Sequence, residues 1–398
     1  MDLLQPVVRP YPWGSRYGIA TLQGRPVPSD GPEAELWMGA HPSAPSGLER
    51  DGRRTTLDTV IASDPARELG PQCVARFGTR LPFLLKVLSA DQALSIQVHP
   101  SRAQAEAGFR AENKRGLAPG DPARNYVDDW PKPEVLCALT PFEVLTGLRA
   151  PADAAGILRA LRVGQLRPLA AELETAASDL RGVLRSVLEW PEAGRAELVG
   201  RVVDACVRLA SVDGPYAGVC TAALRTAVEH PGDLGVVALL LMRHTVLEPG
   251  EAVFMPAGGL HAYLRGTGIE LLANSDNVVR AGLTGKHVDV PELLKVLDPA
   301  VTVPVLSSCP LADRVAGFDT PAPEFRLYLV DLGAEDLTLP GAGPRIVLCT
   351  EGAVMLRNQA GDTVKMGRGE SCFVSVADGS VRCTGPAHAV LAGAGQLS

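Results

Sequence analysis

The chain has 398 residues, of which 46% are hydrophobic and 21% are charged, and its formal net charge is −7 at pH 7. That length exceeds what one hydrophobic core usually serves, so we expect two or three domains. The small, spread-out negative charge gives no reason to expect a nucleic acid or an anionic membrane as a partner. No basic region precedes an apolar run at the N-terminus, and the longest apolar run, residues 234–242, is too short to span a bilayer. We therefore expect a cytoplasmic protein.

Eight cysteines are scattered along the chain, and no two of them are spaced as CxxC. Cys137, Cys349 and Cys372 lie in apolar runs that are typical of strands. We expect buried free thiols in a reducing cytosol.

The first part of the chain, residues 1–145, contains short strand-like runs broken by proline, glycine and Ser-Asp turns, with helical excursions at 64–78 and 101–115. From about 150 to 230, alanine, leucine, glutamate and arginine dominate, with apolar residues at helical spacing. This pattern predicts a block of four to six helices.

The strand pattern returns at 235 and continues to the end of the chain. Residues 288–298 predict one short helix, and residues 299–312 read as a linker rich in proline and serine. Residues 325–398 again contain short strands and turns.

A weak internal repeat connects the two later β-rich segments. The run GEAVF at 250–254 resembles GESCF at 369–373, and in that register Ser380 falls opposite His261. The repeat favours two related β-barrels, the second without a metal ligand. Chance similarity between two β-turn-β units is the alternative.

A polar row lies at the end of the apolar stretch 81–100. Side chains alternate faces along a strand, so Ser95, Gln97 and His99 point one way while Ile96 and Val98 point the other. Buried polar groups need partners. A metal ion or a polar ligand would supply them.

His261 lies in the run PGEAVFMPAGGLHAY, where a turn, a short strand and a second turn lead into the histidine. This layout resembles the second metal motif of cupin β-barrels, and His99 resembles the histidine of the first. Each histidine alone is more often structural than a ligand, but together with Gln97 they indicate a metal site.

A third segment, residues 131–139, reads as a strand that places Lys132 and Glu134 on one face. A surface ion pair on an edge strand is the usual explanation for such a pair. The apolar continuation VLCAL argues instead for burial, and a buried carboxylate and ammonium need compensation.

Gln97, His99, Glu134 and His261 would offer two nitrogen and two oxygen ligands. Such a set suits Zn²⁺ with one open position for water or substrate. The spacing alone does not choose between Zn²⁺ and Mn²⁺ or Fe²⁺.

Five segments together resemble the type I mannose-6-phosphate isomerase (phosphomannose isomerase) family. They follow the order of the family and cover most of the non-helical part of the first 300 residues. They are YPWGSRYG (11–18), AELWMGAHP (34–42), LPFLLKVLSADQALSIQVHP (81–100), NYVDDWPKPE (125–134) and IELLANSDNVVRAGLTGKHVDV (269–290).

The resemblance implies a mainly β fold with a helical insert, made of two cupin (jelly-roll) barrels and an α-helical domain. We place the first part of the catalytic cupin at 1–148, the helical insert at 149–234, the second part of the cupin at 235–305, and a barrel without a metal site at 306–398. It also implies one catalytic Zn²⁺ per chain, held by the four ligands named above.

The implied reaction interconverts mannose 6-phosphate and fructose 6-phosphate through a cis-enediol, so the partner is a small sugar phosphate. Arg280, in the run NVVRAGLT, matches an arginine that is essential in the family. A guanidinium keeps its charge and can form paired hydrogen bonds to enediolate or phosphate oxygens.

Only six of the 38 cationic residues are lysines, which makes Lys86 and Lys286 individual candidates for the phosphate site. Ser95 shares the face of the polar row and could donate to phosphate or sugar. Trp13 and Glu35 belong to the family motifs, and we expect them to shape the pocket wall. A plain structural role is the alternative for each.

The proton carrier stays open among Lys132, Glu270 and Asp276. Lys132 would serve if nearby cations lowered its pKa, whereas burial of Glu270 would raise the pKa of its carboxyl group toward a useful value. The family often has histidine where this chain has Pro131. Any step that the histidine performs, such as opening the sugar ring, needs another group here or proceeds without catalysis.

Two other functions fit the same ligands. One is a cupin that binds a sugar phosphate without catalysis, and the other is a cupin oxidoreductase that uses Fe²⁺. The joint presence of Lys132, Glu270 and Arg280 favours the zinc isomerase. We expect a monomer, with a homodimer as the alternative.

Overall fold

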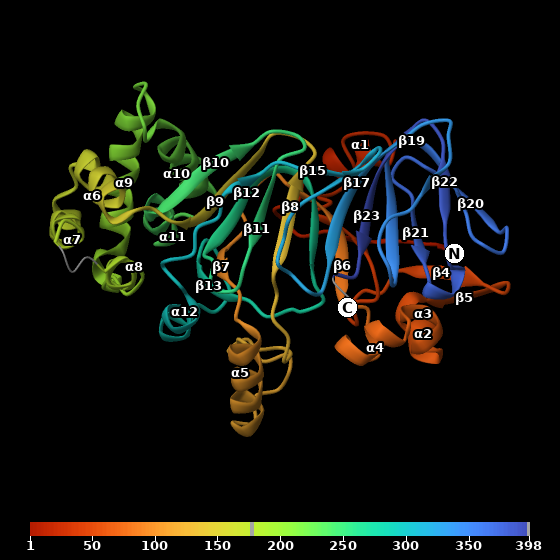
Figure 1. The fold of residues 1–398 in the computed structure, drawn as a ribbon. Coiled ribbons are helices and arrows are strands. Elements are labelled where there is room, and N and C mark those ends of the chain that lie inside the picture. The colour runs from red at the N-terminus through yellow and green to blue at the C-terminus, as the bar shows by residue number, and fades with distance from the viewer. Residues whose placement is uncertain (176–178, 396–398) are drawn as a thin grey trace.

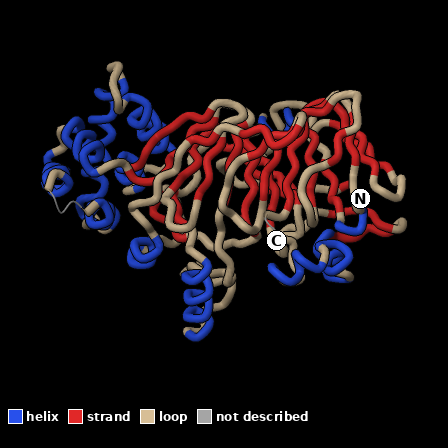
Figure 2. The backbone as a smooth tube through the Cα atoms, viewed as in Figure 1, coloured by secondary structure: helices blue, strands red, loops and turns tan. Residues whose placement is uncertain are grey.

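The computed structural model describes residues 1–175 and 179–395. A helical block lies at one end of the molecule, strands fill the centre, and a second β-unit forms the other end, where the N-terminus also lies (Figure 1). The backbone coloured by secondary structure shows helices gathered at that end and strands running through the rest of the body (Figure 2). The mainly β fold with a helical insert is therefore confirmed. In the described ranges, none of the helices combines the length and the apolar character needed to cross a bilayer.

The central sheet has 11 strands, and all of its pairings are antiparallel. Its path runs β14-β11-β8-β12-β6-β3-β2. Off this path, β7 and β9 pair with β12, β13 pairs with β7, and β10 pairs with β9. The strands are β2 (Val7–Arg9), β3 (Glu35–Met38), β6 (Phe83–Ala90), β7 (Ile96–Val98), β8 (Glu134–Ala138), β9 (Phe142–Leu148), β10 (Met242–Leu247), β11 (Ala252–Met255), β12 (His261–Ala273), β13 (Val279–Gly282) and β14 (Val305–Leu306).

The long strand β12 joins two faces of this sheet. Its first residues pair with β7 and β9, and its later residues pair with β6 and β8. The change of direction falls at Gly266, whose φ is 135°. A Cβ at this position would lie 2.7 Å from the ring of Phe142, so only glycine fits the bend. The bend lets strands from both faces surround one apolar core that includes Phe142, Val253 and Tyr263.

The second sheet has ten strands and packs against the first through a shared core that includes Leu271, Phe325, Ile346 and Phe373. Its strands are β1 (Asp2–Leu3), β15 (Cys309–Ala312), β16 (Val315–Gly317), β17 (Arg326–Leu332), β18 (Leu337–Thr338), β19 (Arg345–Arg357), β20 (Thr363–Gly367), β21 (Ser371–Val374), β22 (Arg382–Thr384) and β23 (Ala387–Gly393). β1 pairs with β21. The first residues therefore lie in the second sheet, although the expected boundaries placed them in the first unit.

The two runs of the internal repeat have the same local structure. Gly250 and Gly369 both have positive φ, at 89° and 81°, and each precedes a short strand, β11 or β21. The amide of Gly250 donates to the carbonyl of Ala138, and the amide of Gly369 donates to that of Cys349. From these turns onward, β11 pairs with β8 in the same register as β21 pairs with β19. The repeat therefore extends beyond the five residues that revealed it in the sequence.

The described part of the helical block contains five α-helices, within the predicted four to six. These are α6 (Pro151–Leu161), α7 (Arg167–Leu173), α8 (Leu180–Leu188), α9 (Glu192–Ala210) and α10 (Ala217–Glu229). The expectation of strands from residue 235 is wrong for the next seven residues, which form α11 (Gly235–Ala238) and a 3₁₀ turn (Leu239–Leu241). This run is buried on all sides, so it has no apolar period to reveal its helical form.

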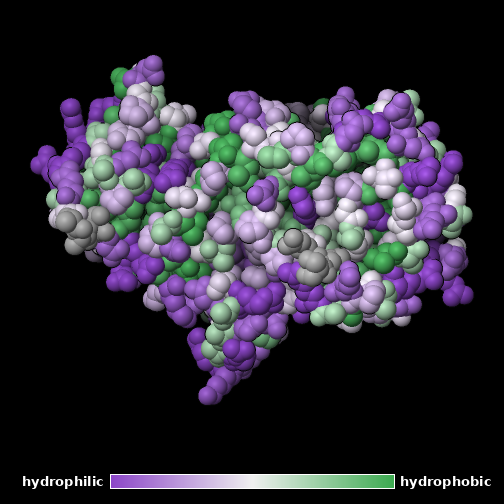
Figure 3. All heavy atoms as spheres, in the orientation of Figure 1, coloured by the Kyte–Doolittle hydropathy of each residue, from purple (hydrophilic) through white to green (hydrophobic). Residues whose placement is uncertain are grey.

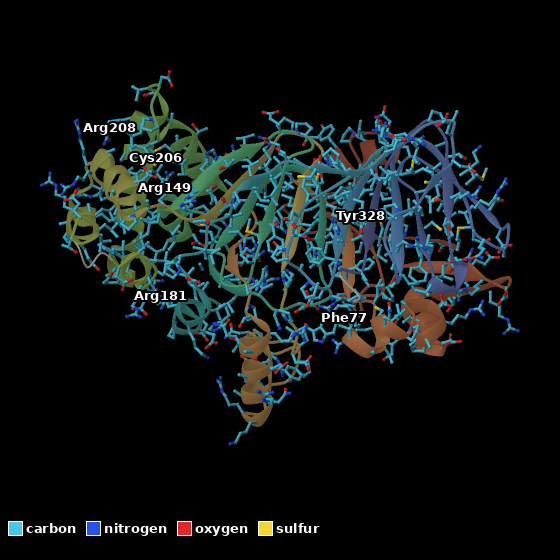
Figure 4. The ribbon with its side chains drawn as sticks, viewed as in Figure 1. Phe77, Arg149, Arg181, Cys206, Arg208 and Tyr328 are labelled. Atoms are coloured by element: carbon cyan, nitrogen blue, oxygen red, sulfur yellow. The ribbon has the colours of Figure 1, made fainter. Side chains whose placement is uncertain are left out.

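Three of the arginines labelled in Figure 4 donate hydrogen bonds to backbone carbonyls in or beside the helical block. Arg208 on α9 donates to the carbonyl of Leu161 within the block, and Arg149, directly after β9, donates to the carbonyl of Leu240. Arg181 donates to the carbonyl of Leu297 at 2.8 Å. Because Leu297 ends a helix that follows the central sheet, this contact ties the block to the sheet.

The other helices surround the two sheets. They are α1 (Gly18–Leu22), α2 (Leu57–Ser63), α3 (Pro65–Leu69), α4 (Pro71–Phe77), α5 (Arg102–Lys114) and α12 (Val290–Val296), and a small hairpin joins β4 (Gly47–Arg50) to β5 (Arg53–Thr56). The expected helices at 64–78, 101–115 and 288–298 are confirmed. α5 projects from the body, and the tip of this projection is hydrophilic, whereas hydrophobic side chains gather over the central strands (Figure 3).

All eight cysteines are free thiols, as expected. Seven are buried, but Cys309 on β15 is exposed. The expectation of uniformly buried thiols is wrong at this position, because every residue of β15 is exposed.

Glu143 connects the helical block to the central sheet. This β9 side chain accepts hydrogen bonds from Arg225 on α10 and from His244 on β10. Burial would raise the pKa of Glu143, but His244 and Arg225 outweigh burial and hold the pKa below its ordinary value. The carboxylate therefore stabilises the fold above the pKa that it has in the unfolded chain, and that contribution is lost as the pH falls toward the lower pKa of the folded state.

We expect Glu143→Gln to destabilise the protein by about 1–3 kcal/mol near pH 7, because it removes two charge-assisted hydrogen bonds. Thermal unfolding followed by circular dichroism should show a lower melting temperature, and the gap to the wild type should narrow as the pH falls below about 4. Asp336→Asn, which breaks an exposed pair with Arg382, should change little. A gap that is the same at every pH would contradict this assignment.

Candidate metal centre and its cavity

Three strands of the central sheet bring two histidines and a glutamate together. Glu134 begins β8, His261 begins β12, and His99 directly follows β7. The Glu134 carboxylate lies with Oε1 2.9 Å from His261 Nε2 and with Oε2 3.3 Å from His99 Nε2. All three side chains are fully buried, and their ligand atoms lie within 4.8 Å of one another.

Backbone carbonyl groups fix the orientation of both imidazole rings. His99 Nδ1 lies 2.7 Å from the carbonyl oxygen of Asn277, and His261 Nδ1 lies 3.1 Å from that of Gly259. A carbonyl oxygen only accepts hydrogen bonds, so in each neutral ring Nδ1 carries the hydrogen and Nε2 keeps its lone pair. Both lone pairs therefore face the Glu134 carboxylate, as they do where histidines bind metals.

In this arrangement two buried lone pairs receive no hydrogen bond. His99 Nε2 and Glu134 Oε2 are buried and have no hydrogen-bond partner. Burial, assisted by the positive charge of Lys132, lowers the pKa of His99 to about 4. Burial would raise the pKa of Glu134, but His261 and Lys132 outweigh it and hold the pKa well below its ordinary value. Two imidazole Nε2 atoms and a carboxylate, aimed at one point, fit a divalent cation, and zinc favours this donor set.

Gln97 approaches the same point from β7. It is the register partner of His261 on β12 and of Arg280 on β13, and its Nε2 lies 3.3 Å from His261 Nε2. Half a turn of the amide would bring Oε1, the atom that ligates metals, to this position. Ile96 and Val98 belong to the core beneath the helices, whereas Gln97 lines a cavity. The predicted alternation of this strand is thus confirmed.

A cavity of about 460 Å³ opens beside Gln97. Its walls come from the N-terminal segment, the loop before β7, the segment from 276 to 286, and the end of the helical block. Seven of the residues proposed from the sequence line it: Trp13, Glu35, Ser95, Gln97, Asp276, Arg280 and Lys286.

Lys86 and Glu270 lie opposite each other on β6 and β12. Lys86 Nζ is 3.0 Å from Glu270 and 3.5 Å from Glu35, and the Trp37 indole donates to Glu35 at 2.8 Å. Burial would lower the pKa of Lys86, but the two carboxylates outweigh it and raise the pKa; burial raises the pKa of Glu270. Neither Lys86 nor Glu270 lines the cavity.

Lys132 is buried beside the metal donors, with its Nζ 3.6 Å from Glu134 Oε2. Asp276 instead lies on the loop before β13, where its carboxylate is 45% exposed and 3.3 Å from the ring of His41. The candidate proton carriers therefore occupy three different environments: a cationic position next to the metal donors, a buried ion pair, and the cavity wall.

Several residues of the cavity were not proposed from the sequence. Tyr11, Trp37, Thr284 and His230 also line it. Tyr11 and Trp37 belong to the quoted motifs, so their segments carried a signal but their side chains were not singled out. His230 follows the last residue of α10, and nothing in the amphipathic pattern of the block indicates that its end reaches the site.

Comparison with known proteins identifies the family. Residues 1–151 match the model of the phosphomannose isomerase type I catalytic domain. The mannose-6-phosphate isomerase of Escherichia coli (strain K12) is 36% identical over 391 residues, with 95% of each chain covered. The chain belongs to the type I phosphomannose isomerase family. The mannose-6-phosphate isomerase of Emericella nidulans is 35% identical over 408 residues, with 88% of this chain and 85% of the other chain covered.

Solved structures of the type I phosphomannose isomerase family extend the likeness to the whole fold. A mannose 6-phosphate isomerase bound with zinc and yttrium is 32% identical and superposes with a TM-score of 0.89, and both chains are fully covered. A mutant phosphomannose isomerase from Salmonella typhimurium superposes with a TM-score of 0.91 at the same identity and full coverage. The family membership expected from five motifs is confirmed.

We expect His261→Ala and Glu134→Gln to lower the affinity for zinc by more than about 100-fold, because the loss of an outer-shell partner alone costs 10- to 100-fold. Metal analysis of the purified variants after dialysis measures this effect. His244→Ala is the matched control, since it removes a carboxylate-paired histidine outside the cluster. One zinc ion per chain in a correctly folded His261→Ala variant would contradict the assignment.

Proposed function

We propose that this chain is a zinc-dependent aldose-ketose isomerase that interconverts D-mannose 6-phosphate and D-fructose 6-phosphate. The observation that carries the proposal is the buried cluster of Glu134, His99 and His261, whose unshared electron pairs meet beside a cavity lined by Arg280 and Lys286. The substrate follows from the family, whose members are named for this reaction. Gln97, His99, Glu134 and His261 would hold the zinc.

Arg280 and Lys286 form the proposed phosphate site. Both line the cavity, and in residues 1–175 and 179–395 neither side chain has an acidic partner. Burial lowers the pKa of Arg280, and burial together with the charge of Arg280 lowers the pKa of Lys286. Two neighbouring cations without a counterion fit a dianionic phosphate. Ser95, in the loop before β7, and Trp13, in the N-terminal segment, would contact the sugar phosphate from the other walls of the cavity.

Bound zinc would supply Lewis-acid polarisation of the sugar oxygens. Lys132, held beside Glu134, would add positive charge where the enediolate develops, and Arg280 would donate hydrogen bonds to the same oxygens. Asp276 faces the cavity and is the proton carrier that we favour, because a carboxylate there can reach substrate. Lys86 is neutralised by Glu35 and Glu270, which favours a supporting role for this trio over direct phosphate binding or proton transfer.

We also propose a finer architecture for the two β-units. The bent strand β12 and the shared local structure of the two repeat runs support a pair of cupin barrels. The catalytic cupin would comprise residues 4–148 and 235–305, interrupted by the helical insert at 149–234. Residues 306–398 would form the second barrel, together with β1 (Asp2–Leu3), which pairs with β21. We propose that the protein is cytoplasmic and monomeric.

The direct test is an assay of the purified protein with mannose 6-phosphate, coupled through fructose 6-phosphate to NADPH formation. We expect turnover that is abolished by a chelator and restored by zinc. Tight binding without product would identify a sugar-phosphate-binding cupin, and oxygen consumption with bound iron would identify an oxidoreductase. Either result would overturn the proposal.

Lys286→Met tests the phosphate site. We expect KM for mannose 6-phosphate to rise about 10- to 100-fold, because a charged hydrogen bond contributes about 1.5–3 kcal/mol, while zinc content stays unchanged. Lys295→Met is the matched control, since this lysine is an exposed residue of α12 that pairs with Glu292. An unchanged KM in Lys286→Met would place the phosphate elsewhere.

A further inference from the structure

His41 lies directly behind the cavity wall, in the turn that follows β3. Its side chain is 6% exposed and its Nε2 is 3.3 Å from the Oδ2 atom of Asp276, whose carboxylate is 45% exposed and lines the cavity. A buried ring thus contacts a carboxylate that substrate can reach. In the described ranges of the chain, no other side chain is bonded to the Asp276 carboxylate.

The surroundings of His41 determine which ring nitrogen carries the hydrogen. The backbone amide of Ser43 donates to Nδ1 at 3.2 Å, and the hydroxyl of the same serine lies 2.9 Å from it. A backbone N–H can only donate, so Nδ1 must be the nitrogen with the free lone pair. The hydrogen of the neutral ring is therefore on Nε2 and points at Asp276. The ring of Trp37 packs edge-on against His41 at 4.9 Å and fixes its plane.

The loop that carries Asp276 is held from the opposite side by Asp128. The amide of Asp276 and the hydroxyl of Ser275 donate to the Asp128 carboxylate, both at 2.8 Å, and the Asn277 amide group donates to the carbonyls of Asp128 and Trp130. These bonds fix the backbone but do not involve the Asp276 carboxylate. Among the described residues, His41 is the side chain that bonds to this carboxylate and so selects its rotamer.

We propose that His41 is a positioning residue, which holds one oxygen of Asp276 so that the other oxygen faces the substrate in the cavity. The inference rests on the proposed isomerase function, in which Asp276 acts on the sugar. His41 itself is not among the residues that line the cavity. Its contribution therefore passes entirely through Asp276, and this dependence distinguishes it from a residue that merely supports the fold.

The test is a double-mutant cycle in the coupled assay on zinc-loaded protein. We expect His41→Leu to lower kcat/KM about 10- to 100-fold, the loss expected for one hydrogen bond to a charged group. In the Asp276→Asn background the same change should cause no further loss. His41→Gln should retain most of the activity, because its amide nitrogen can donate from the position of Nε2. His244→Leu, a paired histidine outside the cavity, should leave activity unchanged.

Equal losses from His41→Leu in both backgrounds would overturn the proposal, as would an inactive His41→Gln that keeps its fold and its zinc. A readout independent of activity is the ¹⁵N NMR spectrum of the histidine rings, which should show His41 as the Nε2–H tautomer. The opposite tautomer would also overturn the proposal. Wild-type protein that shows this tautomer but does not turn over mannose 6-phosphate would instead refute the proposed function.

Discussion

The rest of the site depends on one constraint, the burial of the Glu134 carboxylate between two imidazole rings. An ionised carboxylate that leaves water is strongly destabilising unless cations or donors surround it. The protein supplies the Tyr263 hydroxyl at 2.8 Å and the Lys132 ammonium at 3.6 Å. Neither satisfies Oε2, which remains without a hydrogen bond. A divalent cation would complete this environment, so metal affinity and the stability of the fold are linked at Glu134.

The metal donors and the cavity wall share one network of hydrogen bonds. The carbonyl of Asn277 orients His99, and the side chain of the same residue binds the segment around Asp128 and Trp130. Asp128 in turn holds the amide of Asp276. Because Asn277 follows Asp276 directly, a shift of His99 would displace the carboxylate at the cavity wall. Ligand geometry and substrate geometry are therefore set together rather than separately.

Residues whose chemistry follows a local pattern could be predicted from the sequence. Gln97 and His99 stand out because a polar row interrupts an apolar strand, and Glu134 stands out because its strand continues as VLCAL. His41 could not be predicted, since its partner lies 235 positions along the chain and only the tertiary fold brings them together. The place of strand β1 in the second sheet could not be predicted for the same reason, because Asp2 pairs with the distant Phe373. The helical form of residues 235–241 could not be predicted, because an evenly apolar segment has no hydrophobic periodicity that would distinguish a helix from a strand.

The strand registers of the two β-units explain why, among the residues that the structure describes, the metal-binding group lies in the first unit. Glu134 pairs with Met255 in the first unit, and Arg345 pairs with Val374 in the second. Since Gly250 and Gly369 begin equivalent turns, Arg345 occupies the place of Glu134. A buried guanidinium at this position repels a cation where the first unit presents a carboxylate. Arg382 pairs with Arg357 as His261 pairs with Thr146, so the register makes Arg382, and not the expected Ser380, the equivalent of His261. The second unit thus keeps the strand pairing and packs against the first through their shared core, while its equivalent position carries the opposite charge.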